Sequence, residues 1–268
     1  MTSEPASNRP PTRPAREGGT VVPLRRSGEA SNACPLAKCD GTGWLDAEGG
    51  AVEPCECRNI TRTRSRARGL ASAIPARYRG VSFDRPPLSD MARSPVSATV
   101  TGVVREFGKS IDKHLDEGEG LWIMGPVGTG KTTLAMAASK AAIEAGRSVA
   151  IYSMPRLLAR IRQTFDAGVG EDSYAQFFER LASVDLLHID DLGAEKQSEW
   201  VLEQLYSIVD ERYQRMRSIL VTSNLSIYEE PECEVLKEQV GHRVVSRLTE
   251  SCETLPLDGD DMRNLYSA

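Results

Sequence analysis

The chain has 268 residues, a formal net charge of −5, 40% hydrophobic residues and 26% charged residues. This is ordinary globular usage, and it excludes a wholly disordered, collagenous or fibrous protein. No apolar run approaches the roughly 18–20 residues that a membrane-spanning helix needs, and Pro and Arg interrupt the N-terminus where a signal peptide would be apolar. We therefore expect a soluble, cytoplasmic protein with no membrane partner.

Charge is distributed unevenly along the chain. Residues 1–70 contain 11 Lys and Arg against 8 Asp and Glu, so the acidic excess lies in the remainder. Residues 1–30 contain five prolines and few large apolar side chains, which cannot bury enough surface to offset the entropy of ordering. We predict a disordered tail over 1–30, a cysteine-rich module over 31–58, a basic linker segment over 59–94, and a folded domain over 95–268.

The linker carries an arginine run. Its members are Arg62, Arg64, Arg66 and Arg68. Such residues can contact phosphates, but no aromatic residues are interleaved for base stacking. A solvated linker and a phosphate-contacting segment both remain open.

Hydrophobic periodicity predicts alternating helices and strands from residue 95 onward. Strands that alternate with helices of 10–20 residues are typical of an α/β fold, with a parallel sheet covered on both faces. In chain order the pattern predicts a helix over 95–117, a strand over 121–124, a helix from 131, a strand over 149–154, a helix from 155, a helix over 174–181, a strand over 184–189, a helix over 202–216, a strand over 219–222, a helix over 233–250 and a strand over 254–257.

A glycine-rich turn follows the first of these strands. Residues 125–132 match the pattern G-x-x-x-x-G-K-[ST] in full. Its glycines let backbone N–H groups curl round phosphate oxygens at the positive end of the next helix. Lys131 would reach the β- and γ-phosphates, and the Thr132 hydroxyl would ligate Mg²⁺. The predicted ATP-binding residues are Gly125, Pro126, Gly128, Thr129, Gly130, Lys131, Thr132 and Thr133.

An acidic pair ends the strand predicted over 184–189. Ligands of parallel α/β sheets bind beyond the carboxyl ends of the strands, where this pair and the glycine turn would meet. We expect Asp190 to hold Mg²⁺, through water, and Asp191 to polarise the attacking water. The alternative is a solvated turn that caps the next helix. His188 is expected to be a buried sheet-face residue and not a ligand.

At this point the sequence resembles the AAA+ superfamily, and more narrowly the DnaC/DnaI-type helicase loaders and the related IstB-type transposition ATPases. The resemblance covers about residues 71–268. Its motifs, in order, are IPARY at 74–78 with FD at 83–84, the glycine turn, IDDLG at 189–193, VTSN at 221–224, RVVSRL at 243–248 and GDDMR at 259–263. It implies an AAA+ P-loop core with a parallel sheet and no substantial C-terminal lid.

The resemblance also implies roles for single residues. Asn224 resembles the sensor-1 residue, Arg247 the arginine finger that reaches the ATP of a neighbouring subunit, and Arg263 the sensor-2 residue. The segment 74–83 resembles the one that packs near adenine. Each arginine has a plainer alternative as a solvated surface residue, and Asn224 as a strand end. Asp191 stands where the superfamily prefers Glu, which implies slow hydrolysis.

Four cysteines precede this domain: Cys34, Cys39, Cys55 and Cys57. Four thiolates can close a tetrahedral Zn²⁺ site, and metal binding would supply the folding energy of so short a segment. The spacing departs from the usual C-x2-C pairs, so reduced structural or redox cysteines are the alternative. Cys233 and Cys252 have no partner in the pattern and are expected to be buried.

From the resemblance we expect an ATP-dependent replication protein that loads a replicative hexameric helicase onto single-stranded DNA, with ATP, Mg²⁺ and Zn²⁺ as cofactors. Self-association through the AAA+ domains would bring Arg247 to a neighbour. Two alternatives remain: an IstB-type transposition helper ATPase, and a nucleotide-gated adaptor that scarcely hydrolyses ATP.

Overall fold

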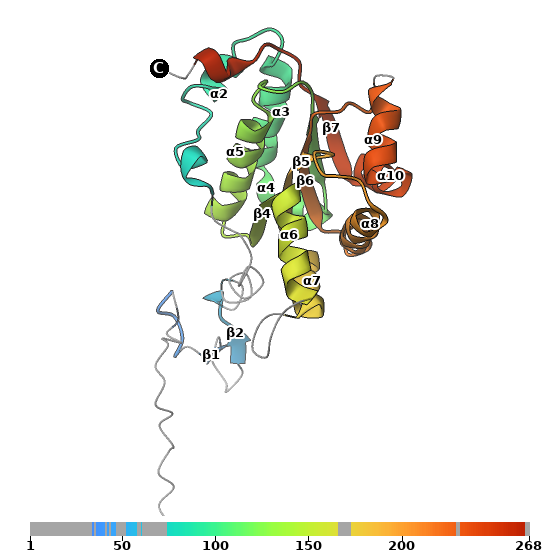
Figure 1. Cartoon of the computed structure of the whole chain (residues 1–268). Coiled ribbons are helices and arrows are strands. Elements are labelled where there is room, and N and C mark those ends of the chain that lie inside the picture. Colours follow the sequence, from blue (N-terminus) through green and yellow to red (C-terminus); the bar gives the residue numbers. More distant parts are fainter. Residues whose placement is uncertain are drawn as a thin grey trace, which may run out of the picture. The chain divides into compact units, whose positions relative to one another are not determined.

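The computed structural model describes residues 34, 36–40, 42, 44–46, 52–57, 60, 74–165, 173–228 and 231–265. The predicted tail over 1–30 and the arginine run at 62–68 lie outside these residues. The chain divides into two compact units, Met1–Cys55 and Glu56–Ala268, and each is described by itself (Figure 1).

The N-terminal unit contains a short antiparallel pair of strands, β1 (Trp44–Asp46) and β2 (Val52–Pro54), with Trp44 opposite Pro54. Two cysteines come before β1, and Cys55 comes directly after β2. The hairpin therefore returns the chain to the first cysteine pair. A single pair of strands is marginal in water without further support.

The larger unit is built on a five-stranded sheet in which every neighbouring pair is parallel. The first strand of this unit in the sequence lies between its fourth and fifth strands. The glycine turn therefore follows an inner strand that is next to one edge of the sheet. The predicted α/β parallel sheet is confirmed. From one edge to the other the strands are β4 (Val149–Ser153), β5 (Leu186–Leu192), β6 (Ser218–Ser223), β3 (Gly120–Met124) and β7 (Cys252–Pro256).

Helices cover both faces of this sheet (Figure 1). Alternate residues of β3 enter the two cores: Leu121 and Ile123 on one side, Trp122 and Met124 on the other, as the period of two in a strand requires. No described helix is long and apolar enough to cross a membrane. The core that contains Leu121 and Ile123 is formed with α2 (Leu88–Met91), α3 (Ala98–Lys109), α4 (Ile111–Glu117) and α5 (Lys131–Glu144). The core that contains Trp122 and Met124 is formed with α6 (Met154–Phe165), α7 (Tyr174–Ser183), α8 (Glu199–Gln214), α9 (Glu232–Val240) and α10 (His242–Ser251).

Two predicted helices are interrupted in the structure. The helix predicted over 95–117 begins at Ala98 and breaks at Ser110, whose hydroxyl donates to the Glu106 carbonyl at 2.8 Å. Ser side chains compete in this way for backbone groups that a continuous helix would use. The helix predicted over 233–250 breaks at Gly241, whose φ of +93° is not helical. The single-helix predictions were wrong because periodicity reports the buried face and not the continuity of the backbone.

Candidate active site

A cavity of about 880 Å³ opens in the larger unit where the glycine turn, β5 and β6 end. Segments far apart in sequence meet there, as expected for the carboxyl edge of a parallel sheet. Tyr78 and Val81 of the predicted adenine-proximal segment also line it. The predicted site residues among its lining are Gly128, Gly130, Lys131, Thr132, Thr133, Asp190, Asp191, Asn224 and Arg263.

The glycine turn packs closely against the chain that follows β7. Gly125 has a φ of +143°, and a Cβ built on it would lie 2.0 Å from the carbonyl oxygen of Leu257. Gly128 has a φ of +90°, and its Cβ would lie 2.2 Å from Cγ of Asp261. Only glycine fits both the backbone conformation and the space. The backbone can thus curve round a hollow without side chains in the way.

Lys131 begins α5 and is buried at the base of this turn. Its Nζ donates to the Pro126 carbonyl at 2.6 Å, and Thr129 Oγ1 donates to the same oxygen at 3.0 Å. Burial lowers the pKa of Lys131, while Asp191 and Asp190 oppose that shift. An ammonium group held by a neutral carbonyl would gain a stronger, charge-assisted partner in a phosphate oxygen.

The acidic pair lies inside β5, not after it. The strand was predicted over 184–189, but β5 continues to Leu192 with a bulge: Ile189 pairs with Val221, and Leu192 pairs with Ser223. Successive side chains of a regular strand point to opposite faces, whereas a bulge redirects them. Together with the φ of +58° at Asp191, the bulge lets Asp190 and Asp191 line the same cavity.

Two threonine hydroxyls hold the Asp190 carboxylate. Thr132 Oγ1 donates to Asp190 Oδ1 at 3.0 Å, and Thr222 Oγ1 donates to the same oxygen at 2.7 Å. Thr222 Oγ1 also accepts the backbone N–H of Asp191 at 2.9 Å. Thr222 was missed as a site residue. The sequence carried a signal for it, because Thr222 is a hydroxyl residue directly after the apolar run 219–221 and two positions before Asn224.

Burial shapes the titration of both carboxylates. It raises the pKa of Asp190, against the hydrogen bonds from Thr222 and Thr132. Burial also raises the pKa of Asp191, and the charge of Asp190 adds to this rise, while Lys131 opposes it. Carboxylate and hydroxyl oxygens are the donors that Mg²⁺ prefers, and a cation here would relieve the repulsion within the pair. The residues present therefore fit Mg²⁺.

The polar residues predicted from the later motifs divide into two groups. Asn224, directly after β6, and Arg263, in the 3-10 helix η2 (Met262–Leu265), both line the cavity. Arg247 is not among its lining residues. Its Nε donates to Asp210 Oδ1 at 3.2 Å, and its guanidinium lies 4.2 Å from the centre of the Tyr213 ring. Within its own chain, Arg247 of α10 therefore contacts α8 and does not line the cavity that holds Asp190 and Asp191.

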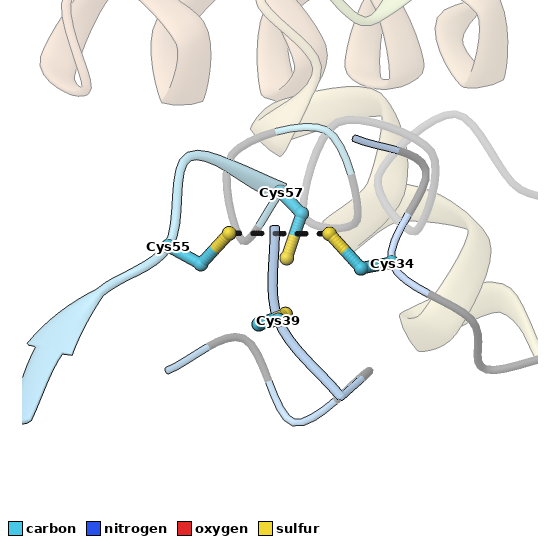
Figure 2. Close-up of side chains that lie close together, drawn as sticks. All are labelled: Cys34, Cys39, Cys55 and Cys57. Atoms are coloured by element: carbon cyan, nitrogen blue, oxygen red, sulfur yellow. Dashed lines mark hydrogen bonds between the residues drawn. The ribbon is translucent and has the colours of Figure 1, made fainter. Parts of the chain in front are cut away.

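The four N-terminal cysteines form a compact thiol cluster (Figure 2). Their Sγ atoms all lie within 4.8 Å of one another, and those of Cys34 and Cys55 are 4.0 Å apart. A tetrahedral zinc with Zn–S bonds of about 2.3 Å places its sulfurs about 3.8 Å apart, so a small contraction would complete such a site.

The Cys34 thiol is more acidic than an ordinary cysteine. Burial raises the pKa of Cys34, but hydrogen bonds from backbone N–H groups, led by that of Cys39, outweigh it and lower this pKa to about 6. The thiolate is the form that binds metal. Cys233 and Cys252 lie in the larger unit and are buried, as predicted.

The family model described as IstB-like ATP binding protein matches residues 109–267 of this chain. The chain belongs to the IstB-like ATP-binding protein family. This IstB-like protein is 32% identical over 156 residues to the insertion sequence ATP-binding protein y4pL of Sinorhizobium fredii; the match covers 58% of this chain and 60% of y4pL. It is 31% identical over 205 residues to the replicative helicase loader DnaC of Escherichia coli, covering 75% and 76% of the two chains.

The IstB-like protein also resembles solved structures. The crystal structure of the DnaC helicase loader matches with a TM-score of 0.58 at 27% identity, over 69% of this chain and all of that one. The crystal structure of DnaI matches with a TM-score of 0.54 at 18% identity and shares the fold. The predicted AAA+ P-loop core is confirmed, and so is the resemblance to the DnaC and IstB groups.

Proposed function

We propose that this IstB-like protein hydrolyses ATP and uses the cycle to load a replicative hexameric helicase onto single-stranded DNA. The observation that carries the proposal is one cavity that joins a buried lysine on a glycine turn to a threonine-held carboxylate pair. That combination suits a nucleoside triphosphate with its cation. The loading role is supported by the relationship to DnaC across three quarters of this chain.

The glycine turn would bind the phosphates of ATP. Its backbone N–H groups and the Lys131 ammonium would hold the β- and γ-phosphates at the start of α5, where the helix dipole favours negative charge. Thr132 and Asp190 would hold Mg²⁺, which neutralises charge on the phosphoryl group. Tyr78 and Val81, on the cavity wall, would flank the base.

Hydrolysis would be the work of Asp191. Its carboxylate would accept a hydrogen bond from a water whose oxygen attacks the γ-phosphorus, as the bond from that phosphorus to the bridging oxygen of ADP breaks. The water proton would pass to Asp191, whose pKa is raised by burial, which makes it the better acceptor. Asn224 would orient the water and Arg263 would contact the γ-phosphate. The short arm of Asp191 favours slow turnover.

A second subunit would complete the site. Because Arg247 stands away from its own cavity, it would act on the nucleotide of a neighbour in a head-to-tail assembly and stabilise charge in the transition state. ATPase activity would then rise with protein concentration, or with single-stranded DNA that gathers the subunits. DNA contact would be directed mainly at the phosphate backbone.

The cysteine cluster would bind one zinc ion. The metal would supply folding energy that the short N-terminal hairpin lacks. We assign helicase binding to this N-terminal unit.

A second candidate function is a transposition helper with a transposase as partner. The 32% identity to an insertion sequence ATP-binding protein favours it. Both candidates share the nucleotide chemistry and differ in the protein that they recruit.

Calorimetry of the full chain with ATP and Mg²⁺ tests the site. We expect saturable heat from wild type, and none from Lys131→Ala. Lys109, an exposed lysine on α3, provides the control, because Lys109→Ala should bind as wild type does. Absence of heat from folded wild-type protein would remove the proposal.

Two further assays distinguish the candidate functions. Steady-state ATPase with and without single-stranded DNA separates the enzyme from a nucleotide-gated adaptor. Co-purification with a hexameric helicase, run beside a transposase, separates the two partner classes. Retention of the transposase alone would overturn the loader proposal.

A further inference from the structure

His188 lies on β5 two residues before Asp190 and is fully buried. Its Nδ1 is 2.9 Å from Ser139 Oγ on α5, the helix that begins at Lys131. Its Nε2 has no hydrogen-bond partner within the described part of the chain. The prediction of a buried sheet histidine is confirmed. Its two ring nitrogens, however, lie beside polar side chains, Ser139 and Asp190, and not only among apolar residues.

The unpaired nitrogen is near the acidic pair. Nε2 lies 3.9 Å from Asp190 Oδ1, the oxygen that already accepts the hydroxyls of Thr132 and Thr222. Residues two apart in a strand share a face, so the contact follows from the strand geometry. At 3.9 Å the pair is not a hydrogen bond, and closure by about 1 Å would make it one.

Burying a polar nitrogen without a partner is unfavourable, and an apolar side chain of similar size would avoid that cost. If the Ser139 hydroxyl donates to Nδ1, the imidazole is the tautomer with its proton on Nε2, directed at Asp190. The ring then connects α5 with the carboxylate. Every hydrogen bond that Asp190 accepts from the described side chains falls on Oδ1, which leaves Oδ2 to face a cation or its water.

We propose that His188, fixed by Ser139, is a positioning residue for Asp190: its Nε2–H becomes a third donor to Oδ1 when Asp190 holds the cation that accompanies the nucleotide. This rests on the proposed nucleotide site and deepens it. A neutral imidazole would hold the carboxylate in orientation without cancelling the charge that attracts the cation. Partners of metal ligands act in this way, and their loss commonly weakens metal binding 10–100-fold.

The test compares His188→Leu, His188→Gln and Ser139→Ala with wild type. The readout is the affinity for a fluorescent ADP analogue, measured with Mg²⁺ and again with EDTA, together with the melting temperature. We define the Mg²⁺ gain as the ratio of the affinity for the analogue in Mg²⁺ to the affinity in EDTA. We expect His188→Leu to reduce this gain roughly tenfold. The affinity in EDTA should be unchanged, and the melting temperature should not be lowered. His188→Gln, which keeps an N–H donor, should recover part of the gain, and Ser139→Ala should lose a smaller part.

His114 on α4 provides the control, since it lies outside the cavity lining and His114→Gln should leave the Mg²⁺ gain at the wild-type value. An unchanged gain in His188→Leu would overturn the proposal and leave His188 as a packing residue. If His188→Leu does not fold, His188→Gln and Ser139→Ala decide the question. A Mg²⁺ gain at the wild-type value in both variants would overturn the proposal. Failure of wild type to bind the analogue at all would instead refute the proposed nucleotide site.

Discussion

The Thr132 hydroxyl donates a hydrogen bond to Asp190 Oδ1 at 3.0 Å, across 58 positions of sequence. The bond joins the first turn of α5 to the bulge of β5. Two motifs that are separate in the sequence thereby form one site.

Replacing Thr132 by Val keeps the shape of the side chain and removes its hydroxyl. We expect Thr132→Val to weaken nucleotide binding in Mg²⁺ by about 10–100-fold, because hydrogen bonds to charged groups contribute about 1.5–3 kcal/mol. Affinity in EDTA should change little. Thr101→Val is the matched control. Thr101 Oγ1 is buried in α3 and has no hydrogen-bond partner among the residues that the structure describes, so its removal should be neutral or stabilising. Equal Mg²⁺ responses of Thr132→Val and wild type would contradict the assignment.

Two glycines should respond in opposite directions to Ala. Gly128 has a left-handed φ, and its Cβ would overlap Asp261, so Gly128→Ala should lose nucleotide binding and about 1–3 kcal/mol of unfolding free energy. Gly102 is exposed on α3 with open space around it. Gly102→Ala should gain about 1 kcal/mol from helix propensity. Denaturant melts and the calorimetric titration measure both, and a stabilised Gly128→Ala would refute the packing described here.

Purified full-length protein should contain one zinc per chain by elemental analysis. Cys55→Ser should carry none, whereas Cys233→Ser, a buried cysteine of α9, should keep it. Affinity should fall as the pH drops through about 6, because the lowered pKa of Cys34 keeps its thiolate available above that value and protonation competes with the metal below it. Metal-free protein with four titratable N-terminal thiols would remove the zinc assignment.

Arg247→Ala should reduce ATPase activity roughly a hundredfold or more under assembly conditions, the scale of a lost arginine finger. Lys131→Ala should also be inactive, for want of bound nucleotide. Mixing the two should restore activity, because one chain supplies the nucleotide and the other supplies Arg247. Arg215→Ala, which removes an exposed arginine paired with Glu179, is the control. A mixture of Arg215→Ala with Lys131→Ala should be no more active than Arg215→Ala alone. A mixture no more active than its parts would exclude action between subunits.

The parallel sheet, its two-sided core and the position of the site at the carboxyl edge were predicted from the sequence, whereas the spatial order of the strands came only from the structure. Apolar runs of β3, β5 and β6 and the glycine turn are local patterns, and local patterns decide backbone conformation and burial. The placement of Asp190 and Asp191 at the end of a predicted strand indicated that they would meet the glycine turn, while the family resemblance supplied the role of Asn224.

The tertiary structure alone decided how those residues meet. Asp190 and Asp191 share one cavity because the register with β6 forces a bulge. The partners Thr222 and Asp261, and the contact between Ser139 and His188, join segments whose spacing in sequence carries no information about each other. Hydrophobic periodicity determines which face is buried, but the pairing of polar atoms depends on packing between distant elements, and only the folded chain defines it.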